Sequence, residues 1–462
     1  MHLYTRGKGL YGTHVTLDEV LKALHQAHPE AKGEPVVVAE PKQIGEENGM
    51  QSRLCVLELD WKDPEANNLP TKVVLKIPTM MANTEKMKGM SKDWFILFRW
   101  MFLGAMWLFV KLAGVVRFQM FAHMESEIIR MHNIEVDTYE HMKKDEESRL
   151  KTLGIICAQK FDEVHPHNAF FVMEYVPKDA MVSVHYLEDM GEKTFDDILH
   201  QTAVLHSLGY VYSDEEKKSR ERGYATEMMG PLCKKSMLSF MFSGLEKIMG
   251  KCEELTRYRP ILDQITVPES QKSLDLLAGN LKMEKTPTHG DLWTSNMIFT
   301  RSDTDSVDLK AIIDFQGFHF GNPAADLTRL FATALPTDVR KEKWQHFIDR
   351  YYEHLENEAQ GRPLPFTKYS ITLCYMFYYP FAAFFNAIHK SSMIEYEVSH
   401  VPEEHKEQAR GKIKENMRGT IAHAIELFET VTDDSWRGKQ ILENGVPSDL
   451  EVFSTFRKIA SK

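Results

Sequence analysis

The chain has 462 residues, of which 43% are hydrophobic and 27% are charged, so its composition is that of a folded globular protein and excludes a disordered chain. Its 56 basic and 67 acidic residues give a net charge of -11, which disfavours nonspecific attraction to nucleic acid, and we expect no nucleic-acid partner. The length is sufficient for one large two-part unit or for two domains.

The cysteines predict a reducing environment. The chain has five of them, an odd number, without a CxxC pair. This pattern offers no disulfide framework, and free thiols are typical of cytosolic proteins. The first residues, Met1–Thr13, are polar and contain no apolar stretch of the signal-peptide type. We therefore expect a cytoplasmic protein.

The first third of the chain predicts a helix followed by three strands. Thr16 and Glu19 have the spacing of a capping box, and apolar residues then recur at helical intervals up to Pro29. Runs rich in Val, Leu and Ile follow, separated by clusters of Gly, Asn and Pro, and we expect them to form an antiparallel sheet. These runs are Val36–Ile44, Arg53–Trp61 and Thr71–Ile77.

An apolar insert over about 90–121 interrupts this pattern. Its centre, Trp94–Val116, contains an uncharged run, Trp100–Val110, that would make about 16 Å of helix against a bilayer hydrocarbon core of ~30 Å. Three interpretations are open, because an apolar helix face can pack against protein, lie on a membrane surface or cover a lipophilic ligand. We expect no membrane crossing here.

Two further strands complete the predicted sheet, and the pattern beyond them is helical. The strands are Leu153–Phe161 and Ala169–Val176. This order predicts an α+β fold with two lobes. The first, residues 1–176, is a small antiparallel β lobe with helices, and the second, residues 177–462, is larger and helical.

The most informative stretch of the sequence is THGDLWTSN, Thr288–Asn296, followed by AIIDF, Ala311–Phe315. The residues between them predict a β-hairpin. Phosphoryl transfer needs an oriented acceptor and metal ions that neutralise phosphate charge. We therefore expect Asp291 to accept the proton of a substrate hydroxyl, and Asn296 and Asp314 to bind Mg²⁺ through oxygen atoms. These residues predict an ATP-dependent phosphotransferase.

The residues of these motifs resemble those of a known group. HGDLW, IDFQ and the run GNPAADLTRL, Gly321–Leu330, resemble the choline-kinase-like branch of the protein-kinase-like fold. Within that branch the chain looks like the animal ecdysteroid-kinase-like (CHK kinase-like) proteins, relatives of choline kinases and aminoglycoside phosphotransferases, from about Gly12 to Phe428. The resemblance implies a two-lobed kinase fold and small-molecule hydroxyl acceptors.

The resemblance also implies roles for residues of the first part. Lys76, in VVLKIP, would contact the α- and β-phosphates of ATP, and Glu135, four residues before Tyr139, would hold that lysine. Glu125 and Glu127 are alternatives to Glu135.

Two further segments would contact the nucleotide. Gly45, Gly49 and Ser52 would offer backbone N–H groups to the phosphates, although the segment lacks the full GxGxxG pattern. The backbone near Glu174, Tyr175 and Val176 would bind the adenine edge as a hinge between the lobes. A plain hairpin turn and a buried strand end are the alternative interpretations.

Asp326, one turn into GNPAADLTRL, has two interpretations. In the family an acidic residue here braces the catalytic loop, whereas an ordinary helix cap would have the same residue type at this position.

The predicted function is thus the transfer of the γ-phosphate of ATP, with Mg²⁺, to a hydroxyl of a small metabolite. An ecdysteroid or sterol-like alcohol, a choline-like alcohol and a xenobiotic alcohol all remain open as acceptors. The alternative is a noncatalytic kinase-like protein that binds a nucleotide or another small molecule. The chain shows no obligate protein partner, and a membrane-surface contact through Trp94–Val116 stays among the predictions.

Overall fold

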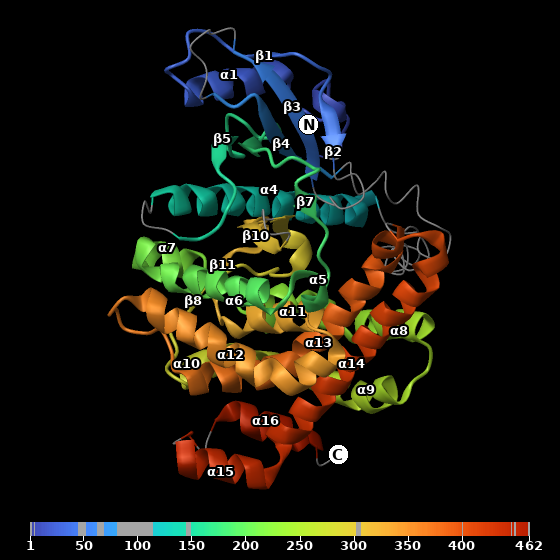
Figure 1. The fold of residues 1–462 in the computed structure, drawn as a ribbon. Helices are drawn as coiled ribbons and strands as arrows, with labels where there is room; N and C mark the ends of the chain where they lie inside the picture. Colours follow the sequence, from blue (N-terminus) through green and yellow to red (C-terminus); the bar gives the residue numbers. More distant parts are fainter. Residues whose placement is uncertain are drawn as a thin grey trace. The chain divides into compact units, whose positions relative to one another are not determined.

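The chain forms two compact units in the computed structural model (Figure 1). The structure describes residues 2–3, 5–44, 52–61, 69–80, 114–144, 149–301, 306–399, 401–444, 446–447 and 450–460. The first unit comprises Met1–Glu146, Thr152–Met181 and Ile313–Gly317, and the second comprises Glu147–Lys151, Val182–Ile312 and Phe318–Lys462. The main division falls near Met181, close to the predicted boundary at residue 176, but the sequence did not indicate that residues 313–317 return to the first unit.

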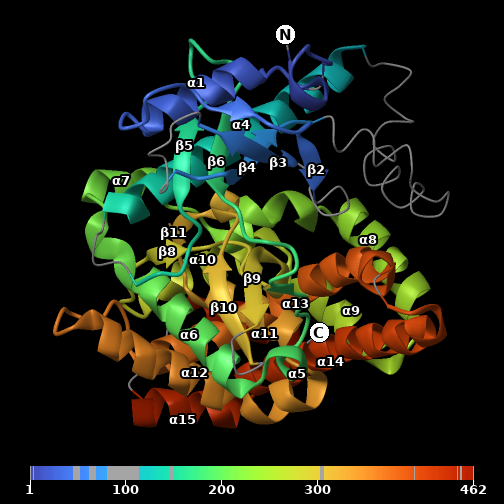
Figure 2. The ribbon, with the colours of Figure 1, turned by 45° about the horizontal axis from the view of Figure 1, so that its top comes forward.

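The first unit is built on an antiparallel sheet with strand order β1-β3-β4-β6-β5, to which β2 adds by pairing with β3 (Figure 2). Its strands are β1 (Val36–Val37), β2 (Lys42–Ile44), β3 (Ser52–Asp60), β4 (Lys72–Pro78), β5 (Ile155–Gln159) and β6 (Phe170–Glu174). The predicted first strand is therefore wrong in one respect, because Val36–Ile44 is broken into two short strands. Pro41 lies in the break, where a residue without an N–H cannot continue the hydrogen-bond ladder.

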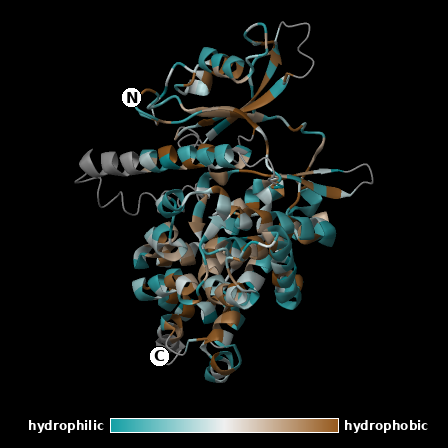
Figure 3. Ribbon diagram, turned by 90° about the vertical axis from the view of Figure 1, so that its left-hand side faces the viewer, coloured by the Kyte–Doolittle hydropathy of each residue, from teal (hydrophilic) through white to brown (hydrophobic). Residues whose placement is uncertain are grey.

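Helix α1 (Leu17–Ala27) packs its apolar face on this sheet. Thr16 and Glu19 form the predicted capping box, in which each side chain accepts from the other residue's backbone N–H. Val20 and Leu24 are fully buried in one core with Leu57 and other strand residues. Figure 3 shows the hydrophobic colour concentrated along the strands that form this core.

Helix α4 (Gly114–Lys144) crosses the first unit and contacts β4, β5 and the short turn of 3₁₀ helix η6 (Phe315–Gly317). Of its apolar residues, Ile128 packs in a small core with Leu3 and Phe161. The helix begins at Gly114, within the last part of the predicted insert. The predictions for Trp94–Val116 lie outside the described residues, apart from the backbone of 114–116, and those for Gly45 and Gly49 lie outside them entirely.

The second unit is mostly helical. Its α-helices, as the described chain shows them, are α5 (Leu187–Met190), α6 (Glu192–Ser207), α7 (Asp214–Ser219), α8 (Lys235–Met249), α9 (Glu253–Ile265), α10 (Pro268–Asn280), α11 (Ala324–Ala334), α12 (Thr337–Ala359), α13 (Lys368–Ser399), α14 (Lys406–Thr432), α15 (Asp434–Asn444) and α16 (Glu451–Ala460), with short 3₁₀ and π helices between them. The α+β fold class, with a small antiparallel sheet and a larger helical part, is confirmed.

Helix α13 is the central helix of the second unit. It is long and apolar enough to span a membrane, but 89% of its apolar stretch is buried by the rest of the protein. Its contacts with α11 and α14 are extensive, and Tyr375, Tyr378 and Tyr379 are at most 1% exposed. The aromatic run Tyr369–Phe385 is therefore mainly core.

Short strands in the second unit carry the predicted motifs. β9 (Met297–Arg301) and β10 (Val307–Ile312) form the predicted antiparallel hairpin, and β7 (Met181–Val182) extends it where the chain enters this unit. β8 (Thr286–Thr288) pairs with β11 (His319–Gly321), a strand that the sequence analysis did not predict. The predicted THGDLWTSN motif thus begins at the last residue of β8, and Asp314 follows the end of β10 by two residues.

Candidate active site

In the first unit, one ammonium group holds two carboxylates from distant segments. Lys76, in the middle of β4, places its Nζ 2.9 and 2.8 Å from the two carboxylate oxygens of Glu135 on α4. The same Nζ lies 2.7 Å from Oδ1 of Asp314. The Lys76 side chain is 12% exposed and that of Glu135 is 2% exposed. A strand lysine held by a helix glutamate is the arrangement of a kinase nucleotide-binding lobe, so the predicted protein-kinase-like fold is supported by the contacts within this unit.

The two alternatives to Glu135 have other partners. Glu125 accepts from the backbone N–H of Leu3 at 2.6 Å and lies 2.9 Å from the imidazole of His2. Glu127 pairs with Arg130 one turn away at 2.6 Å. Both carboxylates therefore stabilise local structure, and the structure brings Glu135, the predicted residue, to Lys76.

Burial and charge act in opposite directions in this cluster. Burial alone would lower the pKa of the Lys76 ammonium, but the carboxylates of Asp314 and Glu135 raise the pKa above the ordinary range of lysine. Burial raises the pKa of Glu135 to about 7, against the opposing effect of Lys76. The ammonium therefore remains positively charged over the physiological range, as a phosphate contact requires.

Asp314 is fixed by its neighbours in an uncommon backbone conformation. Its φ is 69°, in the left-handed region that Asp tolerates better than most residues. Tyr139, one turn after Glu135, hydrogen-bonds with the backbone of Asp314 and packs edge-on against Phe315 at 5.3 Å. Such strain is often retained where it positions a functional group. The aromatic residue of the predicted helix motif thus positions the second carboxylate.

The structure describes only some of the residues that we predicted to contact the nucleotide. Ser52 lines a small pocket together with Lys76, Glu135 and Gln316. The Glu174 carboxylate accepts from the backbone N–H of Gly154 at 3.1 Å, so its side chain stabilises the sheet edge. Tyr175 lies beneath the ammonium of Lys72 at 5.9 Å, and Val176 is buried. The hinge role of residues 174–176 stays a prediction.

In the second unit, Asp326 on α11 organises the loop that carries the catalytic motif. Its two carboxylate oxygens accept from the backbone N–H of His289 at 2.7 Å and of Gly290 at 3.0 Å. His206 on α6 lies 3.2 Å from the same carboxylate. Burial would raise the pKa of Asp326, but the contacts with His206 and His289 lower it below its usual value. Of the two interpretations of Asp326, the contacts support the one in which its carboxylate holds this loop in place.

Gly290 and Asn296 shape the loop around Asp291. Gly290 has a φ of 82°, so a residue with a side chain would be strained at this turn. The amide nitrogen of Asn296 donates to the backbone oxygen of Asp291 at 2.9 Å and lies 3.1 Å from its Oδ2. The amide oxygen is the atom of Asn296 that remains suited to a cation.

A guanidinium that the sequence analysis did not single out holds the other side of Asp291. Arg329 on α11 lies 3.0 Å from Asp291 Oδ1 through Nε and 2.8 Å through Nη2. It also donates to Asn386 at 2.9 Å, and Nη2 lies 2.8 Å from Nδ1 of His389, both on α13. The guanidinium stands over the ring of Trp293 at 5.3 Å. Asp291 is therefore oriented by an arginine that is itself fixed on several sides.

The sequence contains a signal for Arg329. It follows Asp326 by three residues in GNPAADLTRL, so both side chains lie on the same face of a helix. A helix that presents Asp326 to the loop will also present Arg329 to it.

Burial and the charge of Arg329 keep the pKa of His389 well below its usual value, so His389 is neutral and its Nδ1 can accept from Arg329. No comparable pattern points to His389 or Asn386.

The predicted Mg²⁺ ligands have suitable chemistry. Asn296 offers an amide oxygen and Asp314 a carboxylate whose Oδ2 is 3.3 Å from Gln316 Nε2. Within the described part of the chain, no group of three or more His, Cys, Asp or Glu residues gathers as a metal site. Each of these oxygens is of the kind that Mg²⁺ prefers, and the ion usually keeps waters and binds phosphate oxygens as well. The metal would supply charge neutralisation at the phosphates.

Solved structures with similar folds include small-molecule kinases. They are a choline/ethanolamine kinase family protein from Mesorhizobium loti (10% identity, 96% of this chain and 99% of that chain, TM-score 0.39), a putative aminoglycoside phosphotransferase from Ralstonia eutropha (12%, 88% and 98%, 0.38) and an ethanolamine kinase from Plasmodium vivax (13%, 87% and 84%, 0.36). These are the groups that the sequence resemblance names. With TM-scores below 0.5, the likenesses do not bear on the chemistry of this chain.

A curated relative and a family match place the chain among related sequences. The relative is described as "Uncharacterized oxidoreductase dhs-27" from Caenorhabditis elegans and is 24% identical over 218 residues, which are 46% of this chain. The match covers 25% of that protein, so the chain spans about a quarter of the length of this relative. Residues 3–431 match a family with the same description, and the chain belongs to that family, DUF1679.

Proposed function

We propose that this protein is an ATP-dependent kinase that transfers the γ-phosphate to a hydroxyl of a small molecule. The observation that carries the proposal is the Lys76 cluster, in which β4, α4 and the segment after β10 bring one ammonium and two carboxylates together. In a kinase the lysine contacts the α- and β-phosphates, the helix glutamate positions it, and the aspartate binds Mg²⁺.

The second unit supplies the carboxylate that would act on the hydroxyl of the acceptor. Asp291 would accept the proton of the attacking hydroxyl, and Asn296 would be a second Mg²⁺ ligand beside Asp314. Phosphoryl transfer depends mainly on positioning, because the transition state needs little covalent help from the protein. The contacts of Asp291 with Arg329 and Asn296 support this role, since they fix the direction of its carboxylate.

The neighbours of Asp291 favour an uncharged acceptor. A hydroxyl that gives its proton to Asp291 must lie within hydrogen-bond distance of that carboxylate, and hence near the guanidinium of Arg329. The Asp291–Arg329 pair is neutral overall, so it offers a quaternary ammonium no net attraction. Among the acceptor classes that the sequence leaves open, sterol-like and xenobiotic alcohols fit this environment better than choline-like ones.

The name of the curated relative suggests a different chemistry, that of an oxidoreductase, and many such enzymes bind a dinucleotide. The run from Gly7 to Gly12 has the GxGxxG spacing of a dinucleotide-binding loop. That loop must follow a strand, but the described residues before Gly7 form no strand. A Cβ on Gly7 would lie 2.2 Å from the backbone oxygen of Thr13, and one on Gly9 would lie 2.1 Å from that of Val15. These two glycines serve close packing of the chain on itself, and this run is not placed as a dinucleotide-binding loop would be.

The test is phosphate transfer from labelled ATP, with Mg²⁺, to a panel of sterol-like, choline-like and xenobiotic alcohols. The full-length protein should label at least one alcohol, and Asp291→Asn should label it ~10²–10⁴-fold more slowly while still binding Mg·ATP. Nucleotide binding without transfer to any acceptor would favour the noncatalytic alternative. Absence of both binding and transfer would contradict the proposal.

A cytoplasmic location is part of the same proposal. It is supported by the five cysteines, all of which are free: Cys55, Cys157, Cys233, Cys252 and Cys374. Fractionation of cells that express the full-length protein would test it, and recovery with membranes would favour the membrane-surface interpretation of the insert.

A further inference from the structure

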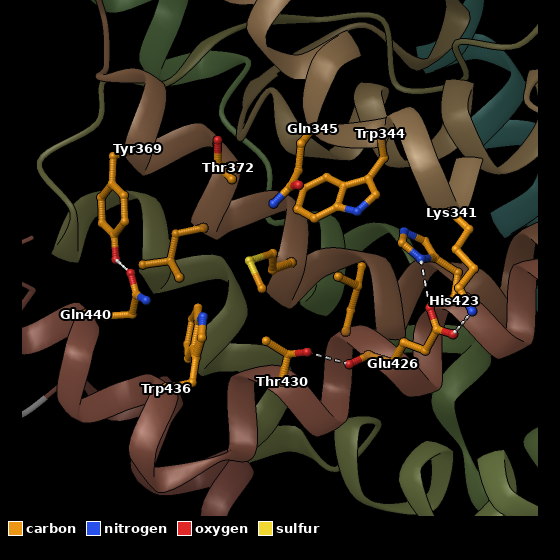
Figure 4. Close-up of a pocket in the computed structure, with 13 residues that line it drawn as sticks. Lys341, Trp344, Gln345, Tyr369, Thr372, His423, Glu426, Thr430, Trp436 and Gln440 are labelled. Atoms are coloured by element: carbon orange, nitrogen blue, oxygen red, sulfur yellow. Dashed lines mark hydrogen bonds and ion pairs between the residues drawn. The ribbon is translucent and has the colours of Figure 1, made fainter. Parts of the chain in front are cut away.

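The second unit contains a cavity of about 390 Å³ between α12, α13, α14 and α15 (Figure 4). Apolar and aromatic side chains share its walls with amide and hydroxyl side chains. Trp344 on α12 stands on one side and Trp436 on α15 on the other, and Leu373, Met376 and Leu427 also line the cavity. A volume of this size lies in the lower part of the range of small-molecule sites in proteins. The cavity is therefore large enough for a ring compound.

The charges at this cavity cancel. Of the described residues that line it, Lys341 and Glu426 are charged, and they pair with each other at 2.8 Å. A charged ligand would find no free counterion there, and it would lose part of its hydration shell on binding. The walls thus favour an uncharged molecule.

Polar groups with hydrogen-bonding capacity stand at the two ends of the cavity. His423 on α14 lines one end and is 4% exposed. Neither ring nitrogen has a hydrogen-bond partner within the described chain, and Nδ1 lies 4.0 Å from Oε2 of Glu426, too far for a hydrogen bond (Figure 4). At the other end the Tyr369 hydroxyl donates to Oε1 of Gln440 at 2.9 Å. A buried polar side chain without a partner costs stability, so its retention calls for an explanation.

The imidazole of His423 is neutral. Burial, together with the charges of Arg340 and Lys341, lowers its pKa to about 3. A neutral imidazole has one N–H donor and one acceptor nitrogen, which matches a hydroxyl group. The unpartnered polar group therefore has the chemistry to orient an uncharged ligand.

This cavity is separate from the network around Asp291. Helix α13 contributes Met376 to the cavity, and it contributes Asn386 and His389 to the contacts of Arg329. These two positions are ten or more residues apart, roughly 15 Å or more along the helix. Trp436 lies beyond residue 431, where the family match ends.

We propose that the cavity between Trp344 and Trp436 is a second small-molecule site, which binds an uncharged flat ring compound with a hydroxyl group. The aromatic walls supply apolar contact to the ring faces, and His423 supplies a hydrogen bond to the hydroxyl. The site does not depend on the phosphotransferase activity proposed above.

The first test uses the neutral fluorescent compound N-phenyl-1-naphthylamine, titrated into the full-length protein. We expect saturable binding that weakens ~10-fold in Trp436→Ala, which removes one wall, and in Thr372→Trp, which fills the cavity from its edge. The matched control is Leu442→Ala, because Leu442 is on the same helix as Trp436 and is 86% exposed. Absence of saturable binding, or equal binding by the two variants and the control, would overturn the proposal.

The second test concerns the hydrogen bond. The unmodified protein should bind 2-naphthol ~3- to 10-fold more tightly than naphthalene, and His423→Phe, which keeps a ring of similar size, should abolish that preference. Circular dichroism and thermal unfolding would establish that each variant is folded. Asp291→Asn should bind N-phenyl-1-naphthylamine as the unmodified protein does. If Asp291→Asn loses that binding, the compound occupies the region of Asp291 and the proposal fails.

Discussion

Two cations, Lys76 in the first unit and Arg329 in the second, each hold a carboxylate that the proposed reaction uses. Lys76 binds Glu135 and Asp314, and Arg329 binds Asp291. In both cases the cation is largely buried, with side chains 12% and 13% exposed. Charge-assisted hydrogen bonds of this kind are stronger and more directional than those between neutral groups. Each cation therefore determines where a reactive oxygen points.

Replacing Lys76 by Met should abolish the contact with nucleotide. The unmodified protein should gain ~2.7 kcal/mol of unfolding free energy from Mg·ATP at about 100 times its Kd, seen as a rise in Tm, and Lys76→Met should lose this gain. The control is Lys72→Met, on the same strand, where the lysine is exposed and pairs with Glu58 at 3.0 Å. An equal rise in Tm for both variants would contradict the role of Lys76.

Replacing Arg329 by Gln should slow the reaction with the acceptor and leave nucleotide binding unchanged. The variant loses the paired contacts with Asp291, and we expect kcat/KM for the acceptor to fall ~10- to 100-fold while KM for ATP is unchanged. Arg257→Gln on α9 serves as the control, since Arg257 is an exposed partner of Glu429. A matching rise in KM for ATP would show that Arg329 acts on the fold and does not position Asp291.

At the scale of secondary structure elements, α11 is the element that assembles the second unit's motif. It follows β11 and presents Asp326 to the loop after β8, while the same face presents Arg329 to Asp291. Asp326 also contacts His206 on α6, whose other nitrogen lies 2.7 Å from the hydroxyl of Tyr351 on α12. One buried carboxylate therefore connects the loop to two neighbouring helices.

Replacing Asp326 by Asn should destabilise the protein and slow the reaction. The amide cannot accept two loop N–H groups as a carboxylate does, and His206 loses an anionic partner, so we expect the free energy of unfolding to fall by ~2–4 kcal/mol. Urea unfolding measures this change. In Asp338→Asn, the exposed residue in the first turn of α12, the loss should stay below ~1 kcal/mol. Equal losses would argue against a special role for Asp326.

Sequence patterns predicted the elements that have strong local signals. The capping box of Thr16 and Glu19 and the hairpin of β9 and β10 are local, so neighbouring residues determine them. The strand β11 was missed because three residues contain too short a pattern, and its partner β8 lies over thirty positions earlier. The break at Pro41 was missed because the run around it is otherwise rich in Val and Ile.

The candidate site was predictable where a residue type and its spacing define the chemistry. Lys76, Glu135, Asp291, Asn296 and Asp314 were each expected, and the structure brings Lys76 to Glu135 and Asp314 and Asn296 to Asp291. The residues around Arg329 could not be predicted in this way. Asn386 and His389 reach it only through the packing of α13 on α11, and such tertiary contacts have no local sequence signal.

At the scale of the whole molecule, buried histidines connect stability to pH. His132 in the first unit is 4% exposed, and burial lowers its pKa to about 4. In the second unit burial lowers the pKa of His423 to about 3 and that of His389 well below its usual value. An unfolded chain would protonate the same three residues near pH 6.5. Each unit therefore contains groups that bind protons more readily after unfolding.

The free energy of unfolding should consequently decrease as the pH falls from about 6.5 towards 4. At these three histidines the unfolded state binds more protons than the folded state, so each lowers the free energy of unfolding by up to ~1.4 kcal/mol per pH unit. Glu135, whose pKa is raised to about 7, acts in the opposite direction but is one group against three. Urea unfolding between pH 7 and pH 5 measures the slope. His423→Phe removes one of the groups and should make the slope shallower, whereas replacing the exposed His405 by Gln should leave it unchanged. A free energy of unfolding that is constant between pH 7 and pH 5 would mean that water reaches these imidazoles in the folded protein. Both units would then be more open around their histidines than their packing indicates.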